Sequence, residues 1–367
     1  MNASIKQRYN SISKLPLLLL LTIAMLVSSC SNDDDTSLPS TDYKSVKNLL
    51  TEGDFQGYAI VTKNGNDLVR QGFGLANQST DLPQNQELAY RIGSVSKTLT
   101  AAAIVGLKRD GLITGFDQTL DEFDPEFPNG DQITIGHLLS HQSGIPEYQL
   151  VAEQAFEEGL VLDRMNIYAL IKELILVNGL SFTPGSNKHY CNSNYLIAAL
   201  LVEQLSGISY HQYIQQHIFN PLGIANSYKG TDEIDTNTHA QGYLNGSHNS
   251  TYPMALAFGA GDFSSTPKDM ETWTKAVKKD WFTEAEKAEI FAQDVPSGYV
   301  DFGMGWFTTQ AGNTTMYWHG GDINGYWSMI GFIPAYDATI VLLSNQQDDT
   351  GEQRNTIIQH LLANEFN

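Results

Sequence analysis

Basic residues and cysteine are both scarce in this sequence, and each shortage narrows what the protein can be. Only 21 of the 367 residues are Lys or Arg, against 41 Asp or Glu, which gives a formal net charge of −20. Because binding to phosphates needs clustered cations, this charge argues against a nucleic-acid partner. The two cysteines are Cys30 and Cys191. If Cys30 is modified, as its context below predicts, Cys191 is the only thiol left and no intramolecular disulfide can form.

Long apolar runs are also scarce, and the one that stands out lies near the N-terminus. Residues 1–14 are basic and carry no acid, and Leu15–Val27 follows as an apolar stretch that is short for a membrane-spanning helix. Small residues then precede Cys30. This order is typical of a signal peptide, and the sequence around Cys30 resembles a bacterial lipobox. We therefore predict a signal peptide over residues 1–29 and lipidation of Cys30; the alternative is a plain secretory signal with an incidental cysteine.

A polar segment follows the predicted lipidation site. Residues 30–41 are rich in Asp, Ser and Thr and too hydrophilic to pack into a core, so we expect a tether. Its acidic stretch is similar to the export signal of surface lipoproteins in some Gram-negative bacteria, although an acidic linker would look the same. The expected location is the outer membrane or cell surface of a Gram-negative bacterium, with the lipid as the only contact to the membrane.

Residues 42–367 alternate between strand-like and helical patterns in an order that predicts one α+β domain. Strand-like segments occur at both ends, where Asn64-Gly65 is a strong signal for a hairpin turn, and the region of about 115–290 is mostly helical. We expect one antiparallel sheet built from both ends of the domain, flanked by helices, with a helical subdomain inserted. The expected strands are 57–62, 67–73, 89–92, 299–309, 314–319, 326–333 and 338–343, and the expected helices are 43–50, 95–109, 133–140, 165–177, 195–205, 210–219, 267–279, 283–292 and 351–362.

Ser94 stands three residues before Lys97, where a strand-like run turns into a helix. On a helix this spacing puts both side chains on one face. A serine hydroxyl becomes a good nucleophile only when a base removes its proton, and a lysine can be that base only when burial or a nearby cation lowers its pKa. The apolar residues around Lys97 are consistent with partial burial. Taken alone, the pair is better explained by an N-cap serine beside a solvated lysine.

The same spacing occurs at two other places. Ser11 and Lys14 lie inside the predicted signal peptide, so processing would remove them. Before Lys268, Pro267 favours the first turn of a helix, and Ser265 or Thr266 is the expected N-cap. Capping explains that occurrence without any chemistry.

Two further segments change the interpretation of Ser94. Tyr190 and Asn192 lie two residues apart in a turn that leads into a helix, and a later strand is expected to end in the basic residue His319, followed by two glycines. Together with Ser94 and Lys97, these segments resemble, in the same order, the three signatures of the serine β-lactamase and penicillin-binding-protein superfamily. The Tyr-x-Asn form is similar to its class C-like branch. The resemblance covers about residues 45–365 and implies a β-lactamase/transpeptidase-like fold.

The resemblance implies a role for each residue. Ser94 would be the acylated nucleophile and Lys97 its hydrogen-bonded partner, while the acylation base stays open between candidates. Tyr190 would transfer protons as general base and then acid, which suits a phenol whose pKa is lowered by neighbouring cations. Asn192 would hydrogen-bond Lys97 and the substrate amide. The backbone N–H groups of Ser94 and Asp322 would form the oxyanion hole.

His319, Gly320 and Gly321 would contribute to substrate binding, with the glycines leaving room for a substrate beside an edge strand. Class C β-lactamases usually have lysine where this sequence has His319, and a histidine is more similar to DD-peptidase, D-amino-acid amidase and esterase relatives. We therefore expect a serine hydrolase acting on a small amide or ester, of the DD-carboxypeptidase or esterase type, rather than an efficient β-lactamase. The alternative is a non-catalytic cell-surface protein that binds muropeptides or β-lactams.

No metal or other cofactor is expected. His137 and His141 have the i, i+4 spacing of metal ligands, but Leu138 stands where a zinc-protease motif needs Glu, and no third ligand is evident. We interpret both histidines as structural. Substrate specificity is expected to lie in loops such as Gln149–Asp163 and Thr231–Thr251, which carry no motif.

Overall fold

The computed structural model describes residues 45–244, 246–249, 251–292, 300–311, 314–347 and 351–366. The predicted signal peptide, the lipidation site Cys30 and the tether lie outside the described residues. None of the helices described in these ranges is both long and apolar enough to span a membrane.

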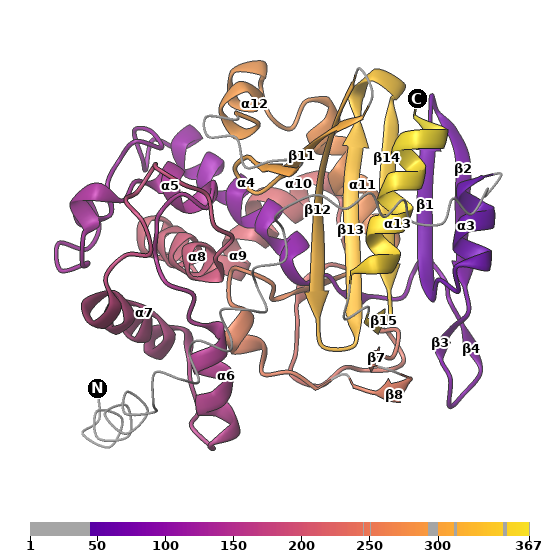
Figure 1. Ribbon diagram of the computed structural model, residues 1–367, viewed down its shortest axis with the longest axis horizontal. Helices are drawn as coiled ribbons and strands as arrows, with labels where there is room; N and C mark the ends of the chain where they lie inside the picture. The colour runs from indigo at the N-terminus through magenta and orange to yellow at the C-terminus, as the bar shows by residue number, and fades with distance from the viewer. Residues whose placement is uncertain are drawn as a thin grey trace, which may run out of the picture. The chain divides into compact units, whose positions relative to one another are not determined.

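The centre of the fold is an antiparallel sheet of seven strands (Figure 1). In spatial order they are β10 (Val300–Phe302), β11 (Phe307–Ala311), β12 (Thr314–Ile323), β13 (Tyr326–Ile333), β14 (Ala338–Ser344), β1 (Gly57–Lys63) and β2 (Asn66–Phe73). Because β1 pairs with β14, the two ends of the domain meet inside one sheet, as the sequence predicted. The hairpin β1–β2 turns at Asn64 and Gly65, whose φ angles of 49° and 78° lie in the left-handed region.

Short strands form smaller sheets around this one. β5 (Tyr90–Arg91) directly precedes the Ser94 segment and pairs with β9 (Phe263–Ser265), which pairs in turn with β6 (Tyr228–Lys229). The chain entering the first motif is therefore fixed by strand pairing. The others are β3 (Leu75–Asn77), β4 (Leu82–Pro83), β7 (Tyr243–Leu244), β8 (Ser247–His248) and β15 (Gln346–Gln347).

Helices cover both faces of the large sheet (Figure 1). α3 (Val46–Glu52) and α13 (Glu352–His360) lie on one face, and α11 (Pro267–Lys279) lies on the other, against β1, β13 and β14. The predicted bounds of α11 are confirmed, and Thr266 is its N-cap, accepting a hydrogen bond from the Asp269 N–H. The Lys268 side chain is 58% exposed. The Ser265/Lys268 pair is thus part of a helix start and not a second reactive pair.

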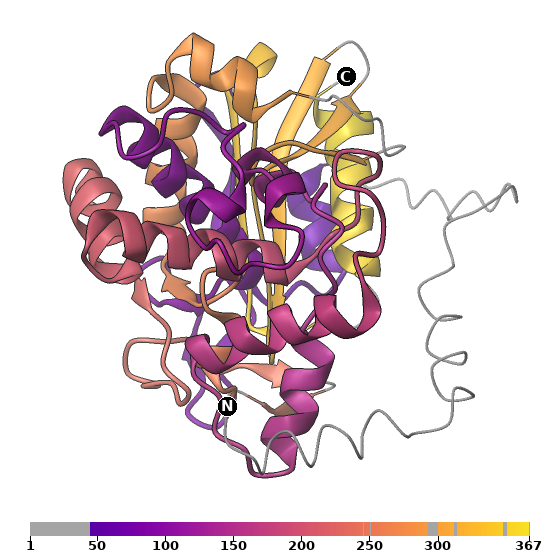
Figure 2. The same cartoon turned by 90° about the vertical axis from the view of Figure 1, so that its left-hand side faces the viewer.

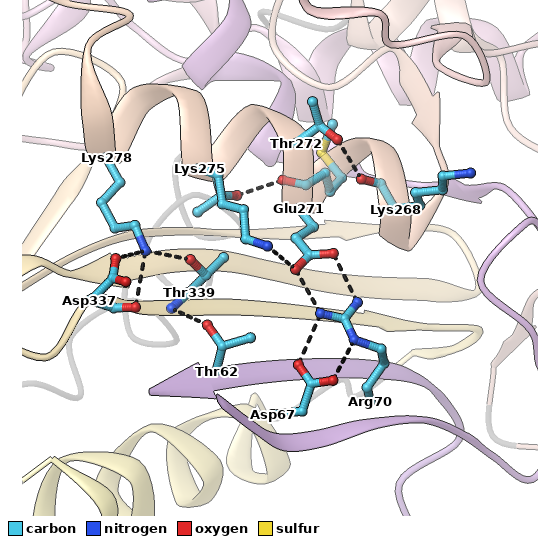
Figure 3. A network of polar contacts seen from close by, with 12 residues as sticks. Thr62, Asp67, Arg70, Lys268, Glu271, Thr272, Lys275, Lys278, Asp337 and Thr339 are labelled. Carbon is cyan, nitrogen blue, oxygen red and sulfur yellow. Dashed lines mark hydrogen bonds and ion pairs between the residues drawn. The ribbon is translucent and has the colours of Figure 1, made fainter. Parts of the chain in front are cut away.

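Polar contacts join α11 to the sheet (Figure 3). Arg70 on β2 donates to both carboxylate oxygens of Glu271 on α11, at 2.9 and 2.8 Å, and also to both oxygens of Asp67. At the other end of the helix, Lys278 Nζ lies 3.0 Å from Thr339 Oγ1 on β14 and 2.6 Å from Asp337 Oδ1. These contacts fix α11 across the sheet whose strand β12 carries the third motif.

The remaining helices form a region beside the sheet, and Figure 2 shows it from its own side. They are α4 (Ser96–Arg109), α5 (Ile135–Leu139), α6 (Gln149–Glu157), α7 (Arg164–Asn178), α8 (Asn192–Ser206), α9 (Tyr210–Ile214), α10 (Asn220–Leu222) and α12 (Glu284–Ile290). α4 packs against α8, and their apolar side chains join one hydrophobic core. Because α4 and α8 begin at the first and second motifs, this packing brings the two motifs together.

Three expected elements differ from the structure. Gln149–Asp163, expected as a loop, contains α6, whose one buried residue is Ala152, so no apolar stripe announced a helix. The strand expected over 299–309 is two strands, β10 and β11. The strand expected to end at His319 continues to Ile323, and the two glycines therefore lie within β12.

Candidate active site

Ser94 lies in the single turn of 3₁₀ helix Gly93–Val95 that leads into α4. The N-cap position of α4 is Val95, which makes no side-chain capping bond, so the alternative interpretation of Ser94 as the cap of this helix is wrong. The Ser94 side chain is partly accessible at the wall of a cavity. Its hydroxyl is thus available to a ligand.

Lys97 is fully buried, with a relative exposure of 0%, and the alternative of a solvated lysine is also wrong. Its Nζ lies 3.0 Å from Ser94 Oγ, 2.7 Å from Asn192 Oδ1 and 2.8 Å from the Ala260 carbonyl oxygen. Burial lowers the pKa of Lys97 to about 7, although the carboxyl of Glu147 acts in the opposite direction. A large fraction of Lys97 is therefore neutral near pH 7.

The three neighbours of Nζ match a neutral amine. The Ala260 carbonyl can only accept, and Asn192 presents its Oδ1 because its Nδ2 donates to Gln149 Oε1 at 2.7 Å. A neutral amine has two N–H donors and one lone pair. The two carbonyl oxygens take the two donors, which leaves the lone pair for the hydroxyl of Ser94. This is the arrangement that a general base for Ser94 requires.

Tyr190 lies beside Ser94, close enough for the two side chains to interact. Its ring packs 4.4 Å from the ring centroid of His141 and 6.1 Å from that of Phe307. The expectation of a lowered pKa is wrong, because burial raises the pKa of the Tyr190 phenol above its usual value of 10. Lys97 Nζ lies 4.8 Å from the ring centroid but is itself only partly charged. Tyr190 is thus a protonated phenol near neutral pH and a proton donor.

Tyr190 is held in place from the preceding turn. Two residues earlier, the Lys188 side chain is 1% exposed and its Nζ lies 2.8 Å from both Asp301 Oδ1 and the Phe302 carbonyl oxygen on β10. A buried ion pair of this kind fixes a loop when both partners are present and destabilises it strongly when one is removed.

His319 was expected to act as a basic residue, but its surroundings keep it neutral. It is buried, it stacks on Phe307 with ring centroids 4.2 Å apart, and its Nδ1 lies 2.6 Å from the Gly320 carbonyl oxygen. Burial lowers the pKa of His319 to about 3, and the proximity of Lys97 contributes in the same direction. At neutral pH His319 therefore offers no positive charge to a substrate.

The second half of β12 borders the site. The pairing of β11 with β12 ends at Phe307 and Trp318, so residues 319–323 pair with β13 on one side only and form a local edge. A Cβ atom on Gly321 would come within 2.1 Å of the Ile92 carbonyl oxygen and 2.9 Å of the Ser94 nitrogen. Glycine at 321 is thus required for β12 to approach the Ser94 turn.

This approach places the two expected oxyanion donors on facing segments. Ser94 and Asp322 both line the cavity, and a Cβ on Gly93 would lie 3.0 Å from the Asp322 nitrogen. Two backbone N–H groups converging on one point stabilise an oxyanion because they are fixed before charge develops. The Ser94 and Asp322 nitrogens thus lie on facing segments at the cavity wall, where the expected oxyanion hole requires them.

Two further groups near the site, Arg354 and Glu147, were not predicted from the sequence. Arg354 on α13 donates to Asp322 Oδ2 at 2.7 Å and lies over Gly320, where an added Cβ would meet its guanidinium at 3.4 Å. Glu147 accepts from the backbone N–H of Asn192 at 2.6 Å and of Gln149 at 3.0 Å. Glu147 therefore fixes the starts of α8 and α6 relative to each other.

A cavity of about 320 Å³ lies at this junction. Of the residues singled out in the sequence, Ser94, Asn192 and Asp322 line the cavity, whereas Lys97, Tyr190 and His319 are not among its lining residues. Its volume is at the small end of the roughly 300–1,000 Å³ range of small-molecule sites. The lining residues are Gly93, Ser94, Tyr148, Gln149, Glu153, Asn192, Tyr252, Leu256, Ala257, Ala260, Gly261, Asp322, Ile323, Asn324 and Gln347.

The two histidines with metal-ligand spacing have structural partners. His137 Nδ1 accepts from the Thr134 N–H at 3.3 Å in a capping box, and His141 is buried and accepts from the Cys191 N–H at 3.1 Å. In the described part of the chain, no group of three or more His, Cys, Asp or Glu side chains is arranged to hold a metal ion.

The chain is also similar to known proteins over most of its length. A family model described as Beta-lactamase matches residues 44–365. The chain is 27% identical to penicillin-binding protein 4* of Bacillus subtilis, with 81% of this chain and 69% of that protein covered. It is 26% identical to the D-aminopeptidase of Gluconobacter oxydans, with 79% and 55% covered.

Solved structures extend the comparison to the fold. A penicillin-binding protein from Bacillus halodurans has a TM-score of 0.72 at 23% identity, with 86% of this chain and 98% of that chain covered. The D-amino acid amidase of Ochrobactrum anthropi has a TM-score of 0.71 at 20% identity, with 86% and 97% covered. The expected β-lactamase/transpeptidase-like fold is confirmed.

Proposed function

The chain belongs to the beta-lactamase family and is a serine hydrolase of that family, and on this premise we propose that it hydrolyses small amides through an acyl-enzyme on Ser94. The observation that carries the proposal is the environment of Lys97, whose two N–H groups face carbonyl oxygens while its lone pair faces the Ser94 hydroxyl. A protein that only binds ligands has no use for a base prepared in this way.

Acylation would begin when Lys97 takes the proton of Ser94 and Ser94 Oγ bonds to the substrate carbonyl carbon. The N–H groups of Ser94 and Asp322 would stabilise the resulting oxyanion, a contribution of about 3–4 kcal/mol for one such donor in another serine hydrolase. Tyr190 would donate its proton to the leaving nitrogen as the C–N bond breaks. The proton on Lys97 would then pass to the Tyr190 oxygen, which restores both neutral groups.

Deacylation would use Lys97 again, first as base and then as acid. A water molecule would lose a proton to Lys97 and attack the acyl carbonyl carbon. The bond to Ser94 Oγ would break as the proton returns from Lys97 to that oxygen. The products are a carboxylic acid and the free enzyme, so atoms and protons balance over the cycle.

The D-aminopeptidase and D-amino acid amidase relatives support D-aminoacyl amides as the substrate class. The neutral His319 supports the same choice, because it provides no charge for the terminal carboxylate that a DD-carboxypeptidase or β-lactamase substrate carries. Assignment to the class C-like branch stays a proposal based on the Tyr190-x-Asn192 motif.

The test is covalent labelling of Ser94. The domain is incubated with a fluorophosphonate, and the adduct is located by mass spectrometry. We expect one adduct, on Ser94, and its loss in Ser94→Ala with an unchanged circular dichroism spectrum. A Ser94→Ala variant that hydrolyses p-nitrophenyl esters at the wild-type rate would falsify the assignment of the nucleophile. No adduct in the wild type would favour a non-catalytic binding protein.

We also propose that Cys30 anchors the domain to a membrane through lipid, as its sequence context indicates. Expression of the full chain in a Gram-negative host with an alkyne-labelled fatty acid provides the test. Label should appear on the wild type and disappear in Cys30→Ser, and equal labelling of both would contradict the proposal.

A further inference from the structure

Glu153 projects from α6 to the wall of the catalytic cavity. Its Oε1 accepts hydrogen bonds from Gln149 Nε2 at 2.8 Å and from the Tyr252 hydroxyl at 3.0 Å. Both partners are neutral. Among the salt bridges of the described ranges, none involves Glu153. A carboxylate is thus placed at the cavity without a cation.

The rest of the lining does not compensate for this charge. Of the residues that line the cavity, the two acidic ones are Glu153 and Asp322, and none is Lys, Arg or His. Asp322 is paired with Arg354 at 2.7 Å, so its charge is balanced. The wall formed by α6 therefore carries net negative charge, which favours a cation in the cavity and opposes an anion.

A continuous series of hydrogen bonds connects this carboxylate to the reacting atoms. Lys97 Nζ contacts both Ser94 Oγ and Asn192 Oδ1, Asn192 Nδ2 donates to Gln149 Oε1, and Gln149 Nε2 donates to Glu153 Oε1. The distances in the last two links are 2.7 and 2.8 Å. Glu153 is therefore held in a fixed position relative to Ser94 and lies on the same side of the cavity as Asn192.

We propose that Glu153 binds the protonated amino group of the substrate and makes the enzyme selective for amides with a free amine on the acyl side of the scissile bond. The inference rests on the proposed function and narrows its substrate class. An ammonium group can donate to Glu153 Oε2 and replace the missing counter-ion. An N-acyl substrate lacks the charge, and a substrate with a carboxylate at that position meets repulsion.

The test uses two substrates that differ only in this charge, D-alanine p-nitroanilide and its N-acetyl derivative. In the wild type we expect kcat/KM to be about 10- to 100-fold higher for the free amine, the range for a charge-assisted hydrogen bond. Glu153→Gln keeps an oxygen that accepts from Gln149 and Tyr252 but removes the charge, and it should bring the ratio close to one. Glu157→Gln is the matched control, since Glu157 is exposed on the same helix and does not line the cavity.

Two further readouts separate selectivity from damage to the site. Fluorophosphonate carries no amine, so it should label Ser94 at equal rates in the wild type and in Glu153→Gln. Protection from labelling by D-alaninamide and by N-acetyl-D-alaninamide, measured over times too short for the amides to be consumed, reports occupancy of the site, and the free amine should protect at about 10-fold lower concentration or less.

The outcomes of these assays distinguish the role of Glu153 from the proposed function. A ratio that falls in Glu153→Gln and persists in Glu157→Gln supports the inference. An unchanged ratio in Glu153→Gln, a wild-type preference for the N-acetyl compound, or equal protection by both amides overturns the inference while labelling of Ser94 leaves the proposed function standing. Absence of labelling in the wild type refutes the proposed function and the inference with it.

Discussion

Acylation of Ser94 should become about 10-fold faster between pH 6 and pH 8 and then level off, because the base is the neutral form of Lys97. Burial lowers the pKa of Lys97 to about 7. For that value, roughly 9% of the lysine is neutral at pH 6 and roughly 91% at pH 8. A lysine with its usual pKa would instead give a rate that rises about 100-fold over this interval and keeps rising.

The same profile distinguishes Lys97 from Tyr190 as the base. Burial raises the pKa of Tyr190 above its usual value of 10, so the phenolate would become abundant only at strongly alkaline pH. If the phenolate were the base, the acylation rate would increase by a factor of about 10 for each pH unit through pH 9. A plateau above pH 8 therefore indicates the amine.

The assay is the pre-steady-state release of p-nitrophenolate from p-nitrophenyl acetate between pH 5 and pH 9 at constant ionic strength. This ester does not titrate in that range, and release is followed at the isosbestic wavelength of p-nitrophenol and p-nitrophenolate, so the profile reports the enzyme. Lys97→Arg should lose acylation at every pH, because a guanidinium is never neutral in a protein. A wild-type rate that is independent of pH, or one that still climbs with unit slope at pH 9, would refute the role of Lys97.

Other predictions follow from the same contacts. Tyr190→Phe should slow hydrolysis of p-nitroanilides by about 10²–10⁴-fold and of p-nitrophenyl acetate much less, because p-nitrophenolate leaves without a proton; equal losses would contradict the role of Tyr190 as acid. Gly321→Ala should lower the free energy of unfolding by about 1–3 kcal/mol and impair labelling of Ser94, because the added Cβ would clash with the Ile92 backbone carbonyl. Gly320→Ala is the control: its Cβ would contact only the flexible Arg354 side chain, so its melting temperature should be close to that of the wild type. Lys188→Met should destabilise by about 3–5 kcal/mol in chemical denaturation, because it removes the buried ammonium partner of the Asp301 carboxylate; a loss below about 1 kcal/mol would argue against a strong contribution from that ion pair.

Features fixed by short stretches of sequence could be predicted well. Asn64-Gly65 specifies a turn with positive φ at both positions, and the hairpin is where it was expected. Thr266 followed by Pro267 specifies a helix start, and α11 has the predicted bounds. The expected antiparallel sheet, built from both ends of the domain, is confirmed by the pairing of β1 and β13 with β14. It could be predicted because the strands at each end have clear β patterns.

The features that were missed or wrong depend on contacts between distant segments. α6 has no apolar stripe and is placed by polar contacts, among them the one from Tyr252 to Glu153. Arg354 reaches Asp322 only because α13 lies against the sheet near β12. The direction of the pKa shift of Tyr190 depends on rings from three other segments, which no pattern around Tyr190 reveals.

Burial has opposite effects on the two proton-transfer groups, and this explains how one site has both a base and an acid at neutral pH. Loss of hydration disfavours the charged form of any group, so it lowers the pKa of the Lys97 amine and raises that of the Tyr190 phenol. At neutral pH roughly half of the Lys97 amine and nearly all of the Tyr190 phenol are then neutral, so the amine can accept a proton and the phenol can give one. With His319 also neutral, the reacting centre carries little charge of its own. Electrostatic selection among substrates therefore falls to the periphery of the cavity, where Glu153 is the carboxylate without a counter-ion among the lining residues.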